Sequence, residues 1–328
     1  TQGYSSAASD VYKRQAKKPL ILAGGGVNIS HAGEKLKKFM EKENVPVVTT
    51  IMGKGAVPTT HPLYIGNCGM HGKYAANMAV MECDLLFSIG TRFNDRITGD
   101  LNEFAPHAQI VHIDIDTAAI SKNVQVDVPI VADAKEAVSK MLEYVSECET
   151  KKWLATIKEW KEEHPLMMKK KPIMTPQDVI ETINRIFDEA IIVTDVGQHQ
   201  MFTAQFIEIT EKKKLLMSGG LGTMGYGLGA AIGAKMGRPD KTVVNIAGDG
   251  CFRMNMNEIA TAARHNIPVI QVVINNHVLG MVRQWQNLFY GQRYSATVLN
   301  DAVDFVKLAE AMGAEGVRAS TREEFKEA

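Results

Sequence analysis

The chain has 328 residues, a formal net charge of zero and 45% hydrophobic residues. This length suits two domains of ordinary size. Zero net charge gives no electrostatic attraction for nucleic acid or anionic membranes, and no apolar run approaches the length that crosses a bilayer. The four cysteines, Cys68, Cys83, Cys148 and Cys251, have no paired spacing. Their pattern argues against a disulfide framework or a zinc site and fits a reducing cytoplasm.

The two ends of the sequence are unusual. The chain begins with Thr1 rather than methionine, and residues 1–17 are polar and lack periodicity. We expect them to be a disordered or foreign appendage, outside the fold. The run 322–328 stops abruptly at the other end. The sequence therefore predicts a fragment of a longer protein.

From Lys18 onward, short apolar runs alternate with helical patterns. A strand over 19–23 leads into the glycine turn 24–26 and a helix over 32–43. Further β-rich runs cover 45–50, 85–90, 109–114 and 129–132. Strands that alternate with helices indicate a parallel sheet covered on both faces. We expect this α/β domain to span 18–149.

Residues 150–174 are rich in Lys, Glu and Trp without β character, and we interpret them as a linker with a solvated charge run at 169–171. A second α/β domain is expected over 175–328. Thr175 is a plausible helix N-cap, with Pro176 at the first helical position and Asp178 in the first turn. A strand over 191–194, a glycine-rich segment over 218–227 and a small-residue helix over 228–236 follow.

The most informative stretch runs from Gly248 to Asn276. An apolar strand over 243–247 precedes Gly248-Asp249-Gly250, a helical stripe follows, and a second strand over 268–274 leads into Asn275-Asn276. In a βαβ unit the carboxyl ends of parallel strands form the ligand crevice, which brings Asp249 and Asn276 together. Carboxylate and amide oxygens suit Mg²⁺ that keeps positions for phosphate oxygens. The stretch predicts a metal-bridged diphosphate site.

Two other interpretations use the same residues. Gly220, Gly222 and Gly225 fit the dinucleotide-binding pattern G-x-G-x-x-G, with Asp249 at a suitable distance. However, the run 212–216 before the glycines is a poor buried strand, and a dehydrogenase leaves Gly250 and Asn275-Asn276 without a role. The plainest alternative is an ordinary βαβ unit with polar turn residues.

The pairing of Gly-Asp-Gly with Asn-Asn at this spacing resembles the cofactor motif of thiamine-diphosphate-dependent enzymes. Longer tracts narrow the resemblance to the acetolactate synthase (acetohydroxyacid synthase) family, catalytic large subunit, from Lys18 onward. One departure is Asn94, where that family usually has Asp. The tracts are 69–72, 90–96, 196–201, 219–227 and 280–290. The resemblance implies two doubly wound parallel-sheet domains, a central FAD-type domain and a thiamine-diphosphate-binding domain.

For the second domain, the resemblance implies Mg²⁺ ligation by Asp249, Asn276 and the backbone carbonyl of Val278. Met224 would hold the cofactor bent and Met281 would contact its pyrimidine, whereas an arbitrary methionine more often packs in a core. Trp285 would line the pocket for the second oxo acid, the alternative being a buried core tryptophan. His199, without the resemblance, is an ordinary loop histidine. The implied thiamine diphosphate contacts are Gln198, His199, Gly222, Met224, Asp249, Gly250, Cys251, Asn276, Gly280 and Met281.

For the first domain, the resemblance implies a structural flavin that performs no net redox chemistry. Arg96 would also lie in the substrate channel, the alternative being a surface arginine. Glycines permit close backbone approach and arginines pair with diphosphate. The implied FAD contacts are Gly25, Gly26, Thr50, Ile51, Met52, His71, Gly90, Arg92, Arg96, Asp114 and Asp133.

The implied reaction is a transferase reaction: two pyruvates give 2-acetolactate and CO₂, or pyruvate and 2-oxobutyrate give 2-aceto-2-hydroxybutyrate, for isoleucine, leucine and valine synthesis. The family's activating glutamate lies in an N-terminal pyrimidine-binding domain, and we interpret Glu34, Glu41 and Glu43 as surface residues that do not replace it. We therefore expect no catalytic residue in this chain and no activity of the chain alone. The resemblance also implies a dimer or tetramer with shared active sites, a small regulatory subunit and a cytoplasmic location.

Two alternatives remain open for the function. One is another thiamine-dependent enzyme of the pyruvate oxidase or glyoxylate carboligase type, against which the tract Gln284-Trp285-Gln286 argues. The other is a non-catalytic module that keeps the fold for cofactor binding or regulation.

Overall fold

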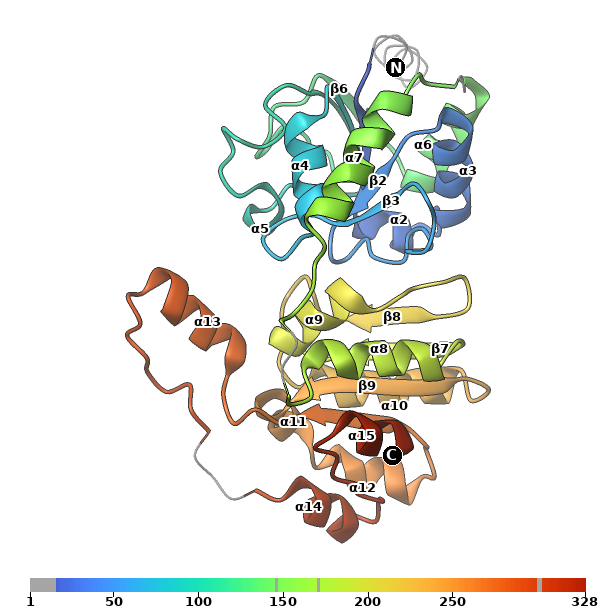
Figure 1. Cartoon of the computed structure of the whole chain (residues 1–328). Coiled ribbons are helices and arrows are strands. Elements are labelled where there is room, and N and C mark those ends of the chain that lie inside the picture. The colour runs from blue at the N-terminus through green and yellow to red at the C-terminus, as the bar shows by residue number, and fades with distance from the viewer. Residues whose placement is uncertain (1–15, 145–146, 170–171, 300–302) are drawn as a thin grey trace. The chain divides into compact units, whose positions relative to one another are not determined.

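The computed structural model describes residues 16–144, 147–169, 172–299 and 303–328, and the expected appendage 1–17 lies mostly outside them. The chain forms two compact units, residues 1–166 and 167–328, shown in Figure 1. Within the described residues, no helix has the length and apolar character needed to span a membrane.

Unit 1 is built on a six-stranded sheet whose paired strands are all parallel. The strand order is β3-β2-β1-β4-β5-β6, so the order reverses between the neighbours β1 and β4. In doubly wound sheets this reversal is where ligands bind. The strands are β1 (Pro19–Ala23), β2 (Val47–Thr49), β3 (Tyr64–Asn67), β4 (Leu85–Ile89), β5 (Gln109–Asp114) and β6 (Val128–Val131).

Helices cover both faces of this sheet. Along β1, Ile21 and Ala23 join one buried cluster, whereas Leu20 and Leu22 join the other. This alternation follows from the two-residue period of a strand. Both faces are therefore buried, as the sequence predicts. On the first face lie α2 (Gly25–Ile29), α3 (Gly33–Glu43) and α6 (Ala134–Met141); on the second lie α4 (Tyr74–Glu82) and α7 (Lys151–Glu163); α5 (Asp95–Thr98) and the short 3₁₀ helix η1 (Leu142–Tyr144) complete the unit.

Part of the range expected to be a linker is a packed helix. In α7, Trp153 and Ile157 are buried in the same cluster as α4. The indole Nε1 of Trp153 donates to the carbonyl oxygen of Pro19 at 3.1 Å. The many Lys and Glu residues lie on the other side of an amphipathic helix, so composition alone conceals two core residues one helical turn apart. The division between the units falls between Leu166 and Met167.

Unit 2 contains a four-stranded parallel sheet in the order β10-β9-β7-β8. Its strands are β7 (Ala190–Thr194), β8 (Lys214–Met217), β9 (Thr242–Gly248) and β10 (Ile270–Ile274). The strand β8 lies at the sheet edge, which explains why residues 212–216 lack the continuous apolar pattern of a buried strand. The helices are α8 (Pro176–Ile186), α9 (Gln198–Phe206), α10 (Tyr226–Gly237), α11 (Asp249–Asn255), α12 (Glu258–Arg264), α13 (Gly280–Phe289), α14 (Phe305–Ala311) and α15 (Arg322–Glu327).

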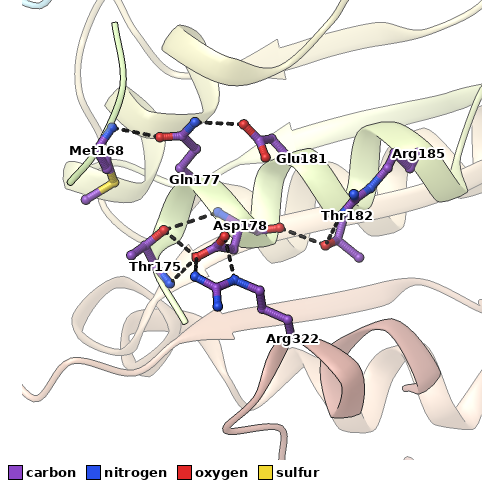
Figure 2. Close-up of polar contacts among 8 residues, drawn as sticks. All are labelled: Met168, Thr175, Gln177, Asp178, Glu181, Thr182, Arg185 and Arg322. Carbon is purple, nitrogen blue, oxygen red and sulfur yellow. Dashed lines mark hydrogen bonds and ion pairs between the residues drawn. The ribbon is translucent and has the colours of Figure 1, made fainter. Parts of the chain in front are cut away.

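The expected start of α8 is confirmed in detail. Thr175 is the N-cap, Pro176 occupies the first turn, and the Thr175 and Asp178 side chains exchange hydrogen bonds with each other's backbone N–H groups. Figure 2 shows that Asp178 also receives the guanidinium of Arg322, from α15. This carboxylate therefore joins the start of α8 to a helix 144 residues further along the chain.

Candidate functional site

The two ends of the Gly248–Asn276 stretch meet at one edge of the unit 2 sheet. Strands β9 and β10 pair in parallel, with Ile274 opposite Gly248. Asp249 is the first residue of α11, directly after β9, and Asn276 follows β10 by two residues. The predicted βαβ unit is confirmed, although its helical part is broken into α11 and α12.

Asp249 has the environment of a ligand to a cation. Its side chain is buried, and its Oδ2 atom has no hydrogen-bond partner. Asn276 is exposed, and its Oδ1 atom accepts a hydrogen bond from the backbone N–H of Val278 at 3.1 Å. A buried carboxylate oxygen without a partner is costly, and a bound cation removes that cost. No cluster of three His, Cys, Asp or Glu side chains suited to a metal occurs in the described parts of the chain. The predicted ligand set contains only one such side chain, so it stays a prediction.

His199 lies against this edge as the second residue of α9, the helix that follows the neighbouring strand β7, so it is a buried helix residue rather than a loop histidine. Its ring fits between two glycines: a Cβ on Gly248 would lie 2.8 Å from Nδ1, and one on Gly197 would lie 3.0 Å from Cε1. The Nε2 atom is buried without a partner. Burial lowers the pKa of His199 to about 4, although Asp195 opposes the change. His199 is therefore a neutral imidazole at neutral pH, with one nitrogen left for a ligand.

Gln198 connects the start of α9 to α13. Its Nε2 atom donates to Oε1 of Gln284 at 3.1 Å. Its own Oε1 atom lies over Gly280, where a Cβ would come within 2.2 Å of it. The absence of a side chain at Gly280 thus admits Gln198 between the two helices. A Cβ on Gly280 would also lie 3.4 Å from the Asn276 Nδ2 atom. The structure thus brings together three residues implied by the resemblance, Gln198, Gly280 and Asn276.

The glycine-rich segment forms a turn between β8 and α10. Gly222 has φ +72°, and Gly222 and Met224 are both exposed. Gly225 has φ +90° and is buried. The segment is held by Asp195, which follows β7 and accepts hydrogen bonds from the backbone N–H groups of Gly225 and Gly227. Sequence reasoning assigned no role to Asp195. The available signal was a carboxylate directly after a strand expected to be buried.

Cys251 and Gly250 line the start of α11. The Cys251 thiol donates to the carbonyl oxygen of Val196 at 2.6 Å. Burial, with Asp195 nearby, raises the pKa of this thiol to about 12, so it is an inert group rather than a nucleophile. A Cβ on Gly250 would lie 2.4 Å from the Leu279 side chain. Their contacts with a diphosphate stay predictions.

The helix α13 carries an open hollow of about 590 Å³. Met281 and Trp285 both contribute to it, while the pyrimidine contact predicted for Met281 and the oxo-acid pocket predicted for Trp285 stay predictions. None of the α13 residues is buried in the described structure, so neither side chain is a core residue of this unit. Trp285 packs edge-on against Phe289, with ring centroids 6.0 Å apart. The lining residues are Met281, Val282, Trp285, Gln286, Tyr290 and Arg293.

In unit 1, the residues predicted for FAD gather along the carboxyl edge of the sheet. Asp114 is the last residue of β5, and the others follow β1 (Gly25, Gly26), β2 (Thr50, Ile51, Met52), β3 (His71), β4 (Gly90, Arg92, Arg96) and β6 (Asp133). The loops after β1 and β4 meet closely, because a Cβ on Gly26 would lie 2.7 Å from the Gly90 Cα. These glycines are thus required by loop packing at the reversal of strand order, whatever binds there.

The polar residues of this edge differ in how accessible they are to a ligand. Arg92 and Arg96 are exposed. Burial, reinforced by the Arg96 charge, lowers the pKa of His71. Asp133 is the N-cap of α6, where its Oδ1 accepts from the backbone N–H groups of Lys135 and Glu136 at 2.8 and 3.3 Å. The two exposed guanidinium groups after β4, beside the reversal of strand order, suit the diphosphate of a dinucleotide, whereas Asp114 and Asp133 lie further along the edge, at β5 and β6.

One residue interpreted as part of a surface is buried. Glu43, at the end of α3, has no exposed area, and its Oε2 accepts from the Cys148 thiol at 3.4 Å. Its position on the inner side of α3 places it in unit 1 and far in sequence from the predicted thiamine diphosphate residues. Glu43 is therefore not a surface residue. That it does not replace the activating glutamate stays a prediction.

Two family profiles match this chain. Residues 14–141 match "Thiamine pyrophosphate enzyme, central domain", and residues 195–328 match "Thiamine pyrophosphate enzyme, C-terminal TPP binding domain". The chain belongs to the thiamine pyrophosphate enzyme family. This membership overturns the dehydrogenase interpretation, and it makes thiamine diphosphate the cofactor of the second unit's fold family.

Individual relatives are large subunits of acetolactate synthase. A probable large subunit from Methanocaldococcus jannaschii is 49% identical over 95% of this chain and 55% of its own length. The large subunit from Corynebacterium glutamicum is 47% identical over 94% of this chain and 51% of its own length. The isozyme 3 large subunit from Escherichia coli is 43% identical over 93% of this chain and 55% of its own length. The chain spans about half the length of the curated relatives it matches.

Proposed function

We propose that this chain supplies the central and thiamine-diphosphate-binding domains of an acetolactate synthase. The proposed reaction joins two pyruvates to give 2-acetolactate and CO₂, or pyruvate and 2-oxobutyrate to give 2-aceto-2-hydroxybutyrate. The observation that carries the proposal is similarity to acetolactate synthase large subunits at 42–49% identity across about 95% of this chain. The convergence of Asp249, His199, Gln198 and Gly280 at one sheet edge supports it.

Magnesium and the diphosphate are assigned to the edge after β9 and β10. The unpartnered Oδ2 of Asp249 would bind Mg²⁺, together with the side-chain oxygen of Asn276 and the carbonyl of Val278. Gln198, His199 and the segment around Gly222 would hold the phosphates. When bound, thiamine diphosphate supplies an electron sink for decarboxylation and carbon–carbon bond formation.

The remaining residues bind and orient the organic part of the cofactor and the substrates. Met224, exposed at the glycine-rich turn, would support the cofactor from one side, and Met281 would contact its pyrimidine. Trp285 in the hollow of α13 would contact the second oxo acid. Met281, Val282 and Trp285 would give the organic part of the cofactor and the second oxo acid an apolar surface to bind against.

FAD is assigned to the carboxyl edge of unit 1, with Arg92 and Arg96 near its diphosphate. We assign it a structural role, since no redox change is needed in the proposed reaction. The proposal further includes a cytoplasmic enzyme of branched-chain amino-acid synthesis, a dimer or tetramer with shared active sites, and a regulatory subunit. The carboxyl group that activates the cofactor is assigned to the portion of the relatives that this chain does not span.

The test is genetic complementation with a chimera. The part of the Methanocaldococcus jannaschii relative that this chain does not span is fused to residues 18–328 and expressed in bacteria that lack acetolactate synthase large subunits. We expect growth without added isoleucine and valine, and acetolactate formation from pyruvate in the extract.

The same chimera with Asp249→Ala serves as the matched control, and we expect it to be expressed but inactive. A soluble chimera that binds thiamine diphosphate yet forms no acetolactate would contradict the proposed function. A chimera that decarboxylates pyruvate without forming acetolactate would favour another thiamine-dependent enzyme.

A further inference from the structure

Asp195 is a buried carboxylate at the centre of unit 2. It directly follows β7, the strand between β9 and β8, and only 1% of its surface is exposed. Burying a carboxylate is costly unless hydrogen-bond donors surround its oxygens. It lies beside the candidate cofactor residues, so the groups that bond to its oxygens are held close to the candidate site.

Both oxygens of Asp195 accept hydrogen bonds from backbone N–H groups of the glycine-rich segment. Oδ1 accepts from Gly225 at 2.9 Å, and Oδ2 accepts from Gly227 at 3.1 Å. Oδ1 also accepts from the N–H of Val196 at 2.8 Å. Gly225 and Gly227 flank the first residue of α10, where helix N–H groups lack partners within the helix. Asp195 therefore caps α10 from a position 30 residues earlier in the chain.

A second contact fixes the same residue from the opposite side. The Asn255 Nδ2 atom, at the end of α11, donates to the carbonyl oxygen of Gly225 at 2.8 Å. Gly225 has φ +90°, and a Cβ there would lie 2.8 Å from the Met254 side chain. A left-handed conformation and a close approach both require glycine at this position. The backbone of Gly225 is thus held between the end of β7 and the end of α11.

The turn before Gly225 carries the residues assigned to the cofactor. In the described structure it is held by bonds within itself, from the N–H of Gly222 to the carbonyl of Ser218 at 3.0 Å and from the N–H of Thr223 to the Ser218 hydroxyl at 3.3 Å. Gly222 and Met224 are exposed on this turn. The direction in which they point therefore depends on where Gly225 is fixed.

We propose that Asp195 is a positioning residue, whose carboxylate fixes the glycine-rich segment so that Gly222 and Met224 are held ready for the cofactor. The effect of Asp195 on cofactor binding rests on the proposed function. Its effect on the position of the glycine-rich segment can be measured without any cofactor. Asparagine cannot replace the carboxylate, because an amide has one acceptor oxygen and its NH₂ group would face a backbone N–H.

The first experiment uses the full chain without cofactor. Hydrogen exchange of residues 218–228 is compared in the unaltered protein and in Asp195→Asn. We expect faster exchange across this segment in the variant, with exchange in β9 unchanged. Asp178→Asn is the matched control, because it alters an Asp of the same unit that bonds to Thr175 and Arg322 instead. Equal exchange of the segment in Asp195→Asn and the unaltered protein would overturn the proposal.

The second experiment measures the dissociation constant of thiamine diphosphate in Mg²⁺ by calorimetry. We expect Asp195→Asn to bind at least roughly tenfold more weakly, as loss of one hydrogen bond to a charged group predicts, and Asp178→Asn to bind normally. Normal affinity in Asp195→Asn would overturn the positioning role. Failure of the unaltered chain to bind would instead contradict the assignment of the diphosphate and Mg²⁺ to unit 2 alone, and the exchange experiment would still decide whether Asp195 fixes the segment.

A second variant covers the case in which Asp195→Asn does not fold. Asn255→Ala removes the other contact to Gly225 while leaving the buried carboxylate in place. We expect it to be folded, to exchange faster over residues 218–228 and to bind thiamine diphosphate more weakly. Unchanged exchange and unchanged affinity in Asn255→Ala would count against the proposal.

Discussion

The lack of side chains at Gly197 and Gly248 determines the protonation state of His199. Because Gly197 and Gly248 carry no Cβ, the imidazole lies flush against the backbone and loses its water. Desolvation disfavours the charged form, so the pKa falls to about 4. A neutral imidazole with a free Nε2 can serve a ligand as a hydrogen-bond partner without adding charge.

This shift predicts a pH dependence of stability. The folded pKa of about 4 lies below the usual value of 6.5, so the unfolded state binds more protons between these values. Stability is then fully present above about pH 6.5 and is lost as the pH falls toward about 4. We expect His199→Gln to lose up to ~3 kcal/mol less over this range than the unaltered protein. Urea denaturation at several pH values measures the difference, and parallel pH profiles for the two proteins would contradict the prediction.

At the scale of elements, the contact between α8 and α15 depends on one carboxylate. Asp178 closes the capping box of α8 and also receives the Nε and Nη2 atoms of Arg322 at 2.7 and 3.0 Å. Figure 2 shows both sets of contacts meeting on this side chain. The side-chain hydrogen bond from Arg322 is the largest cause that lowers the pKa of Asp178 to about 2.

We expect Arg322→Gln to lower the free energy of unfolding of unit 2 at pH 7, because it removes the guanidinium that pairs with the Asp178 carboxylate. Because the folded pKa of Asp178 is depressed, its contribution is present above about pH 4 and disappears as the pH falls toward 2. The variant and the unaltered protein should therefore converge in acid. Arg238→Gln, which breaks the local pair with Asp240, is the control and should be neutral. A constant difference at all pH values would indicate a cause other than the ion pair.

The elements could be predicted best where a local pattern decides them. The cap at Thr175 and the strand over 109–114 depend on neighbouring residues, and both are confirmed. The helix α7 was missed because its two buried residues, Trp153 and Ile157, are identified only by the surface they pack against. The short strand β3 was also missed, since its glycine and asparagine weaken the apolar pattern.

At the scale of the whole molecule, the chain consists of two units with separate hydrophobic cores. Each unit presents the carboxyl edge of its own parallel sheet for a different assigned ligand. Ligand binding to one unit should therefore stabilise that unit alone, because only a state that binds the ligand gains from it.

Calorimetric melting tests this separation. We expect thiamine diphosphate with Mg²⁺, at about a hundred times its dissociation constant, to raise the transition of unit 2 by roughly 5–10 °C. FAD should raise the transition of unit 1 instead. Asp249→Ala should abolish the first shift and leave the second unchanged. A single ligand that raises both transitions equally would contradict the assignment of one cofactor to each unit.

The types of residue in the candidate site could be predicted from the sequence, but the residues that hold them in place could be predicted only in part. The spacing of Asp249 and Asn276 relative to two strands leads directly to one sheet edge, as observed. Asp195 and Gln284 act through contacts 30 and 86 residues apart in sequence, which no local pattern reveals. Roles that depend on a bound ligand, such as those of Met224 and Trp285, stay predictions.

The positions of Asp249 and Asn276 relative to the sheet have a consequence for how a metal would be captured. Asp249 follows β9, which is hydrogen-bonded on both sides, whereas Asn276 follows β10 at the margin of the four-stranded sheet. The Asp249 carboxylate is thus buried beside a strand that is paired on both sides, and Asn276 is exposed in the loop after an edge strand. A metal bound here would be held by one rigid carboxylate and one more mobile amide, so Asn276 would be the ligand that releases first and would set the residence time of the ion.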